Sequence, residues 1–195
     1  PLFLLLGLSH PTVAQEASDS DAPVELDAVS VMGASPDDVR DITGSAHQVD
    51  QETLERDEYD NIHRVLQQVP GVYIRGEDGY GLRPNIGLRG TTTERSQKIT
   101  LLEDRILIAP APYAAPAAYY FPMTSRMVGV EVVKGPGAIA HGPATVGGAV
   151  NLQTRRIPLS TAFGVDAALG TDEYGKVEAH YGDTAGNVGW LIDGV

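Results

Sequence analysis

Five of the fourteen residues between positions 135 and 148 are glycine, and this run constrains the fold more than any other stretch. Glycine adopts positive φ angles and lets two backbone segments approach closely. Apolar residues alternate on both sides of the run, at Val130 and Val132 before it and at Val150 and Leu152 after it. This pattern predicts two strands joined by a tightly folded connector. The run has no obvious nucleophile, acid–base pair or metal cluster, so a plain turn and a part that packs or moves both remain open.

The residues that follow the glycines exclude a phosphate-binding loop. A P-loop closes its glycine run with Lys and then Ser or Thr, whereas Gly147 and Gly148 are followed by Ala149. The dinucleotide motif G-x-G-x-x-G could begin at Gly135, but Ala140 stands where its third glycine is required. The connector is therefore not predicted to bind a nucleotide.

The first fourteen residues join a short apolar run to a site of small residues. The run at 2–8 is far shorter than the about 20 residues that span a bilayer, and Thr12-Val13-Ala14 is typical of a signal-peptidase site. We therefore expect residues 1–14 to be the remnant of a signal peptide, with a buried core segment as the alternative. The chain has no cysteine, so we expect packing or an enclosing partner, rather than disulfides, to stabilise it. Both ends suggest a fragment of a longer protein.

The net charge of −12 comes from one part of the chain. Residues 15–60 hold fourteen acidic and two basic side chains, which gives −12, and the remaining residues balance at twelve of each. Residues 15–25 are therefore predicted to be a disordered acidic leader, and the acidity argues against a nucleic-acid partner. Residues 26–33 then alternate as a short strand, which either pairs with another chain through its free edge or joins its own sheet.

The central part of the chain predicts short helices and strands in alternation. Asp50 is placed to cap a helical turn, and a second helix at about 60–68 ends at Pro70-Gly71. Strands are expected at 72–75 and 85–89, with a hairpin over 99–108. The stretch 109–122 has four prolines and three tyrosines, which predicts a long functional loop; the alternative is a loop whose tyrosines pack on the domain.

Three evenly spaced segments follow, at 163–170, 174–182 and 188–195. In the middle segment the apolar residues Val177, Ala179 and Tyr181 alternate with polar ones. Segments of about ten residues with one apolar face are typical of a transmembrane β-barrel, although an antiparallel sheet with one solvated face has the same pattern. The signal peptide and the lack of cysteine favour the barrel.

Six short motifs, taken together, resemble the plug domain of TonB-dependent outer-membrane receptors. The segment Asp27-Ala28-Val29-Ser30-Val31 resembles the TonB box. The other motifs are VLQQVPGV at 65–72, IGLRG at 86–90, LLEDR at 101–105, VEVVKGP at 130–136 and VGGAVN at 146–151. Each is weak alone, but their order over about 130 residues is specific.

The resemblance implies an α+β plug domain, a mixed sheet with short helices, followed by the start of a transmembrane antiparallel β-barrel. The TonB box region would be 26–33, the plug domain 34–157 and the first strands of a truncated barrel 158–195. Such receptors lie in the outer membrane, with the plug inside the barrel and the TonB box facing the periplasm. The TonB energy-transducing protein pairs with the box and drives uptake of a bound ligand.

Within the family, the chain is most similar to ferric citrate-type siderophore receptors, which implies a ferric chelate as ligand and no cofactor. Guanidinium groups suit anionic chelates, so the expected ligand-binding residues are Arg83 and the loop tyrosines Tyr113, Tyr119 and Tyr120. The resemblance also implies that Arg89 and Lys134 meet barrel glutamates and hold the plug in place, with contact to the ligand as the alternative role for Arg89. Two departures are Ala115, where the ferric citrate receptor has an amide, and Asp104-Arg105, where Asp-Gly is usual.

Other functions stay open on the sequence alone. One is a free-standing periplasmic plug-like interaction domain, and another is a receptor for a different ligand such as cobalamin. An exported enzyme finds little support, because the histidines show no metal-ligand spacing and the common hydrolase motifs do not occur. We therefore expect no catalytic and no metal-binding residues.

Overall fold

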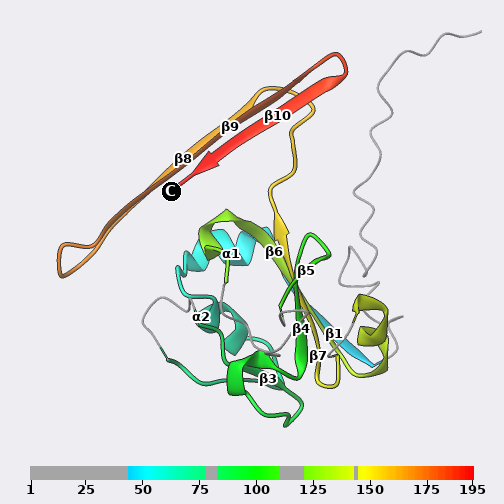
Figure 1. Ribbon diagram of the computed structural model, residues 1–195. Coiled ribbons are helices and arrows are strands. Elements are labelled where there is room, and N and C mark those ends of the chain that lie inside the picture. The colour runs from blue at the N-terminus through cyan, green and yellow to red at the C-terminus, as the bar shows by residue number, and fades with distance from the viewer. Residues whose placement is uncertain (1–43, 78–82, 110–120, 143–144) are drawn as a thin grey trace, which may run out of the picture.

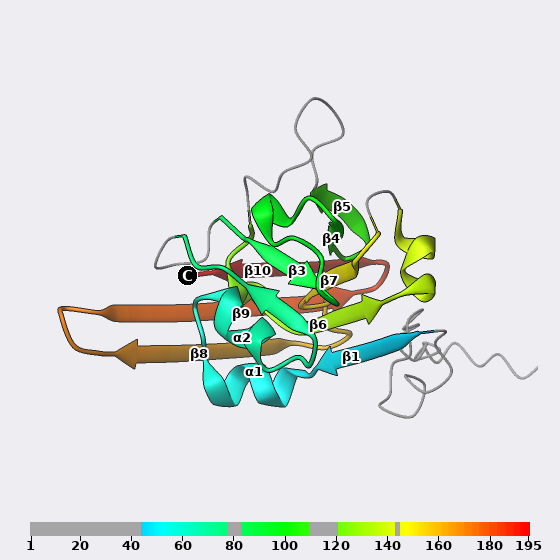
Figure 2. The same ribbon diagram turned by 90° about the horizontal axis from the view of Figure 1, so that it is seen from below.

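The computed structural model describes residues 44–77, 83–109, 121–142 and 145–195. These residues form a mixed-sheet body, 44–155, and a C-terminal sheet that begins at residue 162. In Figure 1 the chain leaves the body after β7 and rises to the C-terminal sheet, which forms a separate layer across it. Figure 2, seen from below, shows the strands of the C-terminal sheet running behind the body.

The body is built on a five-stranded sheet in the order β1-β6-β7-β4-β5. Neighbouring strands are antiparallel except β4 and β7, which are parallel, so the sheet is mixed as predicted. The sequence did not indicate β1, which forms one edge of this sheet. The bounds are Ser45–Val49 for β1, Ile99–Glu103 for β4, Ile106–Ala109 for β5, Met127–Lys134 for β6 and Gly148–Thr154 for β7.

Two short helices and a small hairpin lie against this sheet. Helix α1 (Gln51–Asp57) begins at Asp50, whose side chain accepts a hydrogen bond from the Thr53 amide at 2.9 Å, which confirms the predicted cap. Helix α2 (Ile62–Gln67) agrees with the predicted second helix. Strands β2 (Val72–Ile74) and β3 (Ile86–Leu88) form a separate antiparallel pair. Of the helices in the described ranges, none is long and apolar enough to cross a membrane.

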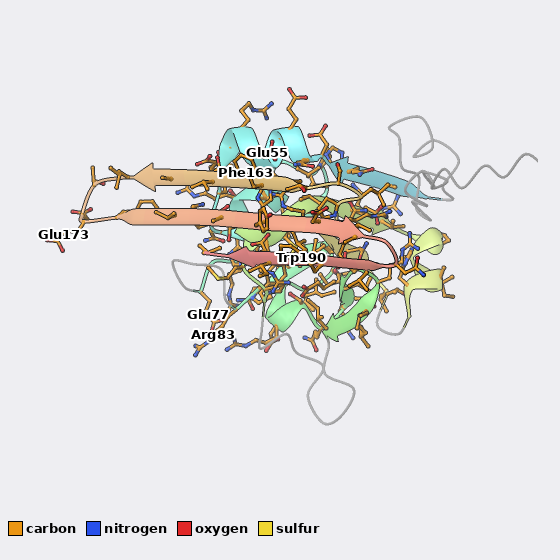
Figure 3. All side chains as sticks on the ribbon, turned by 90° about the horizontal axis from the view of Figure 1, so that it is seen from above. Glu55, Glu77, Arg83, Phe163, Glu173 and Trp190 are labelled. Carbon is orange, nitrogen blue, oxygen red and sulfur yellow. The ribbon has the colours of Figure 1, made fainter. Side chains whose placement is uncertain are left out.

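The C-terminal sheet has three antiparallel strands in the order β10-β9-β8. They are β8 (Ala162–Leu169), β9 (Gly175–Ala185) and β10 (Val188–Gly194). One face of the sheet carries polar and small residues that are partly buried against the body. The opposite face is apolar and exposed, and it includes Phe163 and Trp190, labelled in Figure 3. The apolar face of this sheet therefore points away from the rest of the molecule.

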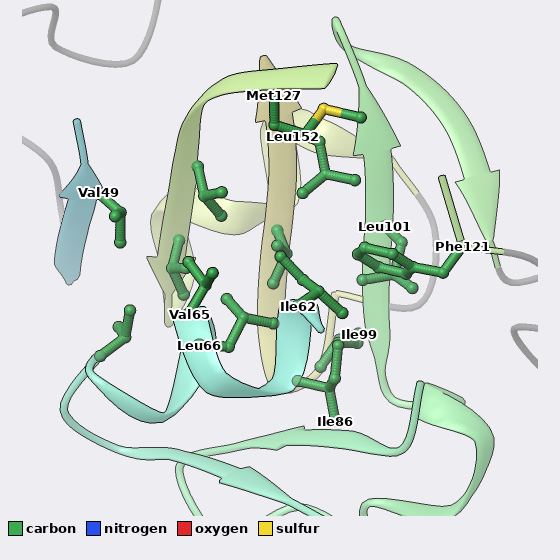
Figure 4. Close-up of a cluster of buried hydrophobic side chains, with 14 of the residues drawn as sticks. Val49, Ile62, Val65, Leu66, Ile86, Ile99, Leu101, Phe121, Met127 and Leu152 are labelled. Carbon is green, nitrogen blue, oxygen red and sulfur yellow. The ribbon is translucent and has the colours of Figure 1, made fainter. Parts of the chain in front are cut away.

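The hydrophobic core lies between α2 and one face of the five-stranded sheet (Figure 4). Helix α2 contributes Ile62, Val65 and Leu66, all at most 2% exposed. Each fully buried side chain of this size stabilises the fold by about 1.5 to 3 kcal/mol relative to an exposed one. A second, smaller cluster contains Leu102, Val133, Ala138 and Ala149. The other core residues are Val49, Val69, Ile86, Leu88, Ile99, Leu101, Phe121, Met127, Val130, Val132, Val150 and Leu152.

Candidate functional site

The glycine-rich connector joins β6 to β7 and is packed closely against its surroundings. Gly148 has φ 150°, and a Cβ atom there would overlap the carbonyl oxygen of Val133 and lie 2.6 Å from Leu88 Cδ1. A Cβ on Gly44 (φ 117°) would likewise overlap the carbonyl oxygen of Lys134. The two predicted strands are therefore confirmed as β6 and β7, and the glycine run is closely packed where it enters β7. The sequence did not indicate the short 3₁₀ helix η4 (Pro136–His141) inside it.

The structure brings Arg89 and Lys134, the two predicted plug–barrel residues, together beside this connector. Arg89 follows β3 and is exposed, whereas Lys134 ends β6 and is only 5% exposed. The Arg89 guanidinium lies against Gly135, the residue after Lys134, because a Cβ added to Gly135 would be only 2.5 Å from Arg89 Nη1. Burial, and then the charge of Arg89, lower the pKa of Lys134.

The Lys134 ammonium donates a hydrogen bond to the carbonyl oxygen of Pro70 at 2.7 Å. Within the described ranges, no carboxylate forms an ion pair with Arg89 or Lys134. Two neighbouring cations, one of them buried, repel each other and favour an anionic partner. An acidic side chain that reached Arg89, the exposed member of the pair, would offset this repulsion.

Arg83, the first predicted ligand-binding residue, lies in a cluster around Glu77. Figure 3 shows the two side chains next to each other at the edge of the body, and Arg83 Nη1 is 4.0 Å from Glu77 Oε1. Glu77 Oε2 also accepts hydrogen bonds from Arg95 Nη1 at 2.7 Å and from Asn85 Nδ2 at 2.8 Å. The sequence did not indicate Glu77, Asn85 or Arg95, because their contacts join a loop to a separate 3₁₀ turn, η2 (Glu94–Ser96).

The remaining predicted site residues lie outside the described residues. They are the TonB box, Asp27 to Val31, and the three loop tyrosines, Tyr113, Tyr119 and Tyr120. Among the residues that the structure does describe, no group of three His, Cys, Asp or Glu side chains is placed to hold a metal ion.

Asp60 makes the most direct polar contact between the body and the C-terminal sheet. Its carboxylate accepts hydrogen bonds from the Tyr174 hydroxyl and from Lys176 Nζ, the latter at 2.9 Å. Burial opposes ionisation of Asp60, but the hydrogen bonds from Tyr174 and Lys176 more than offset it, so the pKa of Asp60 is lowered. Lys176 Nζ also lies 3.0 Å from Glu178 Oε1. The sequence placed Lys176 on the polar face of its strand, but nothing in it pointed to Asp60 as the partner.

A cavity of about 730 Å³ lies beside this contact, between the body and the segment 171–176 at the start of β9. Asp60, Phe121 and Lys176 contribute to its lining, and Arg83 does not. The predicted ligand-binding arginine and this cavity are thus separate features.

Comparison with known proteins places these features in a family. The model of the TonB-dependent Receptor Plug Domain family matches residues 38–149. The chain is 30% identical to a ferric citrate transporter FecA solved in the unliganded form, with a TM-score of 0.65 over 79% of this chain and 25% of that one. The ferric yersiniabactin uptake receptor FyuA from Yersinia pestis shares the fold, with a TM-score of 0.56 and 16% identity over 74% of this chain and 22% of that one.

Curated relatives include vitamin B12 transporters BtuB. That of Photobacterium profundum is 24% identical over 152 residues, which is 78% of this chain and 24% of the relative. That of Vibrio cholerae is 26% identical over 143 residues, 73% of this chain and 23% of the relative. The chain thus spans about a quarter of the length of these relatives, all of which are transporters or receptors. Because the family match covers more than half of it, the chain belongs to the TonB-dependent receptor plug domain family.

Proposed function

We propose that this chain is the plug and the first barrel strands of an outer-membrane receptor that takes up a ferric chelate with energy supplied through TonB. The observation that carries the proposal is a plug fold joined to a sheet whose apolar face points away from the plug. TonB-dependent receptors are outer-membrane proteins, so a hydrocarbon environment is available to that face.

The faces of the C-terminal sheet are arranged in the opposite sense to those of a water-soluble domain. Phe163 is 78% exposed, Val165 68% and Ile192 68%, whereas Lys176 and Glu178 face the body. In water, a contiguous apolar face of this kind would be a liability, but it suits strands that face lipid on one side and an enclosed plug on the other. The same observation disfavours a free-standing periplasmic domain, whose C-terminal sheet would expose this face to water.

The domain limits follow from this assignment. Residues 34–157 would form the plug, and residues 158–195 the first barrel strands. The linker between the body and β8, which includes Ile157 and Pro158, passes close to β9 and β10. A Cβ on Gly182 would lie 2.8 Å from Pro158, and one on Gly189 would lie 2.7 Å from Ile157. Thr184 donates a hydrogen bond to the Pro158 carbonyl at 2.6 Å.

The cation pair Arg89 and Lys134 fits a role in seating the plug. Two adjacent positive charges with no carboxylate partner among the described residues suit acidic side chains on the inner wall of a barrel. The glycine at position 135 supports this role because it keeps the Arg89 guanidinium against the backbone beside Lys134.

The TonB box at Asp27 to Val31 would pair with TonB by strand addition in the periplasm. Val29 and Val31 are β-branched residues, which favour the extended conformation that such pairing needs. Backbone pairing of this type needs free amide groups, so proline within the box should prevent it.

For the ligand, we propose ferric citrate or another anionic ferric chelate that Arg83 and the loop tyrosines contact. Support comes from the exposed guanidinium of Arg83 and from the similarity to the ferric citrate transporter. Cobalamin is the second candidate, because BtuB transporters are among the relatives. We assign the chain no catalytic role.

Equilibrium titration of the full-length receptor with ferric citrate, ferric hydroxamate, ferric catecholate and cobalamin tests the ligand assignment. We expect saturable binding of an anionic ferric chelate and none of cobalamin. Binding of cobalamin alone would contradict the assignment, because a neutral ligand has no use for the arginine site.

A further inference from the structure

Arg95 holds a backbone conformation that residues other than glycine avoid. Its φ and ψ angles are 48° and 26°, and its neighbour Ser96 also has a positive φ of 54°. Conformations of this kind are strained and persist only where the surrounding structure holds them. The position of the Arg95 side chain is therefore imposed by the fold.

Three hydrogen bonds hold this strained turn against the start of β3. The Arg95 amide donates to Asn85 Oδ1 at 2.9 Å, and the Ser96 hydroxyl donates to the Pro84 carbonyl at 2.7 Å. The Ile86 amide in turn donates to the Ser96 hydroxyl at 3.0 Å. Asn85, only 1% exposed, links this turn to Glu77, because its side-chain nitrogen Nδ2 donates a hydrogen bond to Glu77 Oε2.

The result is one carboxylate between two guanidinium groups. Arg95 Nη1 lies 2.7 Å from Glu77 Oε2, and Arg83 Nη1 lies 4.0 Å from Glu77 Oε1. The hydrogen bond from Asn85, and the charges of Arg95 and Arg83, lower the pKa of Glu77, although desolvation opposes them. Glu77 is thus anionic at neutral pH and offsets the charge of one of the two guanidinium groups.

We propose that Glu77 occupies the place of an anionic group of the ligand, and that Arg95 is a second ligand-binding arginine beside Arg83. A carboxylate-bearing ferric chelate displaces Glu77 and takes over its contacts with the two guanidinium groups. The inference rests on the proposed uptake of an anionic ferric chelate and adds a basis for specificity.

The specificity follows from ion exchange. Guanidinium groups bind carboxylates through paired hydrogen bonds, so a ligand carboxylate replaces the lost contact with Glu77 by one of the same kind. A neutral ligand offers no replacement and leaves the Glu77–Arg95 ion pair closed. The cluster therefore selects anionic ligands by competition as well as by attraction.

The test is a titration of the full-length receptor with ferric citrate in the wild type and in Arg95→Gln, Arg95→Lys and Glu77→Gln variants. We expect Arg95→Gln to weaken binding about tenfold, the effect of losing one charge-assisted hydrogen bond. Arg95→Lys, which keeps the positive charge but loses the paired N–H donors of the guanidinium group, should weaken binding less. Glu77→Gln should strengthen binding severalfold, because the internal competitor is gone. Arg156→Gln removes one charge from the exposed linker and should leave binding unchanged.

Arg95→Gln and Glu77→Gln are expected to change the affinity for ferric citrate in opposite directions, which distinguishes a ligand site from a purely structural ion pair. A structural ion pair predicts weaker binding in both variants or unchanged binding in both. Either of those results overturns the inference while wild-type binding of ferric citrate leaves the proposed function intact. A wild-type receptor that binds no anionic ferric chelate overturns both.

Discussion

Replacing Gly148 by alanine tests the close packing of the connector most sharply. Gly148 pairs with Lys134 in the β6–β7 ladder and is fully buried. The added Cβ would overlap the Val133 carbonyl oxygen and lie 2.6 Å from Leu88 Cδ1 and 3.3 Å from Lys134 Cα. Because two of these three atoms are backbone of the paired strand, the strand itself would have to move.

The expected loss of stability in Gly148→Ala is the sum of two separate costs. A non-glycine residue in the region of positive φ that these glycines occupy costs about 1 to 3 kcal/mol, and forcing an extra methyl group into a packed interior costs about 1 to 3 kcal/mol more. Gly142→Ala is the matched control, because Gly142 lies in the same connector with φ 113° but a Cβ added to it would have nothing within 4 Å. We therefore expect Gly148→Ala to cost about 2 to 6 kcal/mol and Gly142→Ala only about 1 to 3 kcal/mol.

Native-state hydrogen exchange of the full-length receptor measures this difference, because it reports the free energy of local opening. Amides of β6 and β7 should exchange roughly ten to a hundred times faster in Gly148→Ala than in Gly142→Ala, at about 1.4 kcal/mol for each factor of ten. Equal exchange in the two variants would refute the close-approach argument and leave positive φ as the sole reason for glycine.

Three further results are expected. Arg105→Gly should stabilise the β4–β5 hairpin by a net of about 0.5 to 1 kcal/mol in the same exchange measurement, because Arg105 has φ 69° in its turn; faster exchange would contradict this. The lowered pKa of Asp60 contributes stability that is present above the unfolded value of about 3.9 and is lost as the pH falls through the folded value. Residues 58–67 should thus exchange faster below about pH 4, and Asp60→Asn should abolish that acid-dependent step. A step of the same size in the wild type and in Asp60→Asn would contradict the predicted contribution of Asp60. Val29→Pro should abolish energy-dependent uptake but not ligand binding, and uptake at the wild-type rate would rule out strand pairing there.

Local signals in the sequence predicted much of the plug. Asp50 and Pro70-Gly71 mark helix ends through their own backbone chemistry, and alternating residues mark β6, β7 and the strands of the C-terminal sheet. The unusual Asp104-Arg105 turn, noted from the sequence, proves to have positive φ at both residues. These features depend on neighbours within a few residues, so the sequence contains the information directly.

Contacts between distant segments could not be predicted in the same way. The parallel pairing of β4 with β7 and the pairing of β1 with β6 depend on register across the whole body. The contacts of Asp60 with Lys176 and of Glu77 with Arg95 join ordinary charged residues that lie far apart in the chain. Only the resemblance to a family brought Arg89 and Lys134 together in advance, and the structure places them side by side.

Uptake by whole cells tests the central claim most directly. Cells that express the full-length receptor would be given radiolabelled ferric citrate with TonB present and with TonB deleted, and bound and internalised iron would be separated. The account predicts that iron binds in both strains but accumulates inside only when TonB is present. Accumulation that is independent of TonB, or no binding of ferric citrate or any other anionic ferric chelate in either strain, would contradict it.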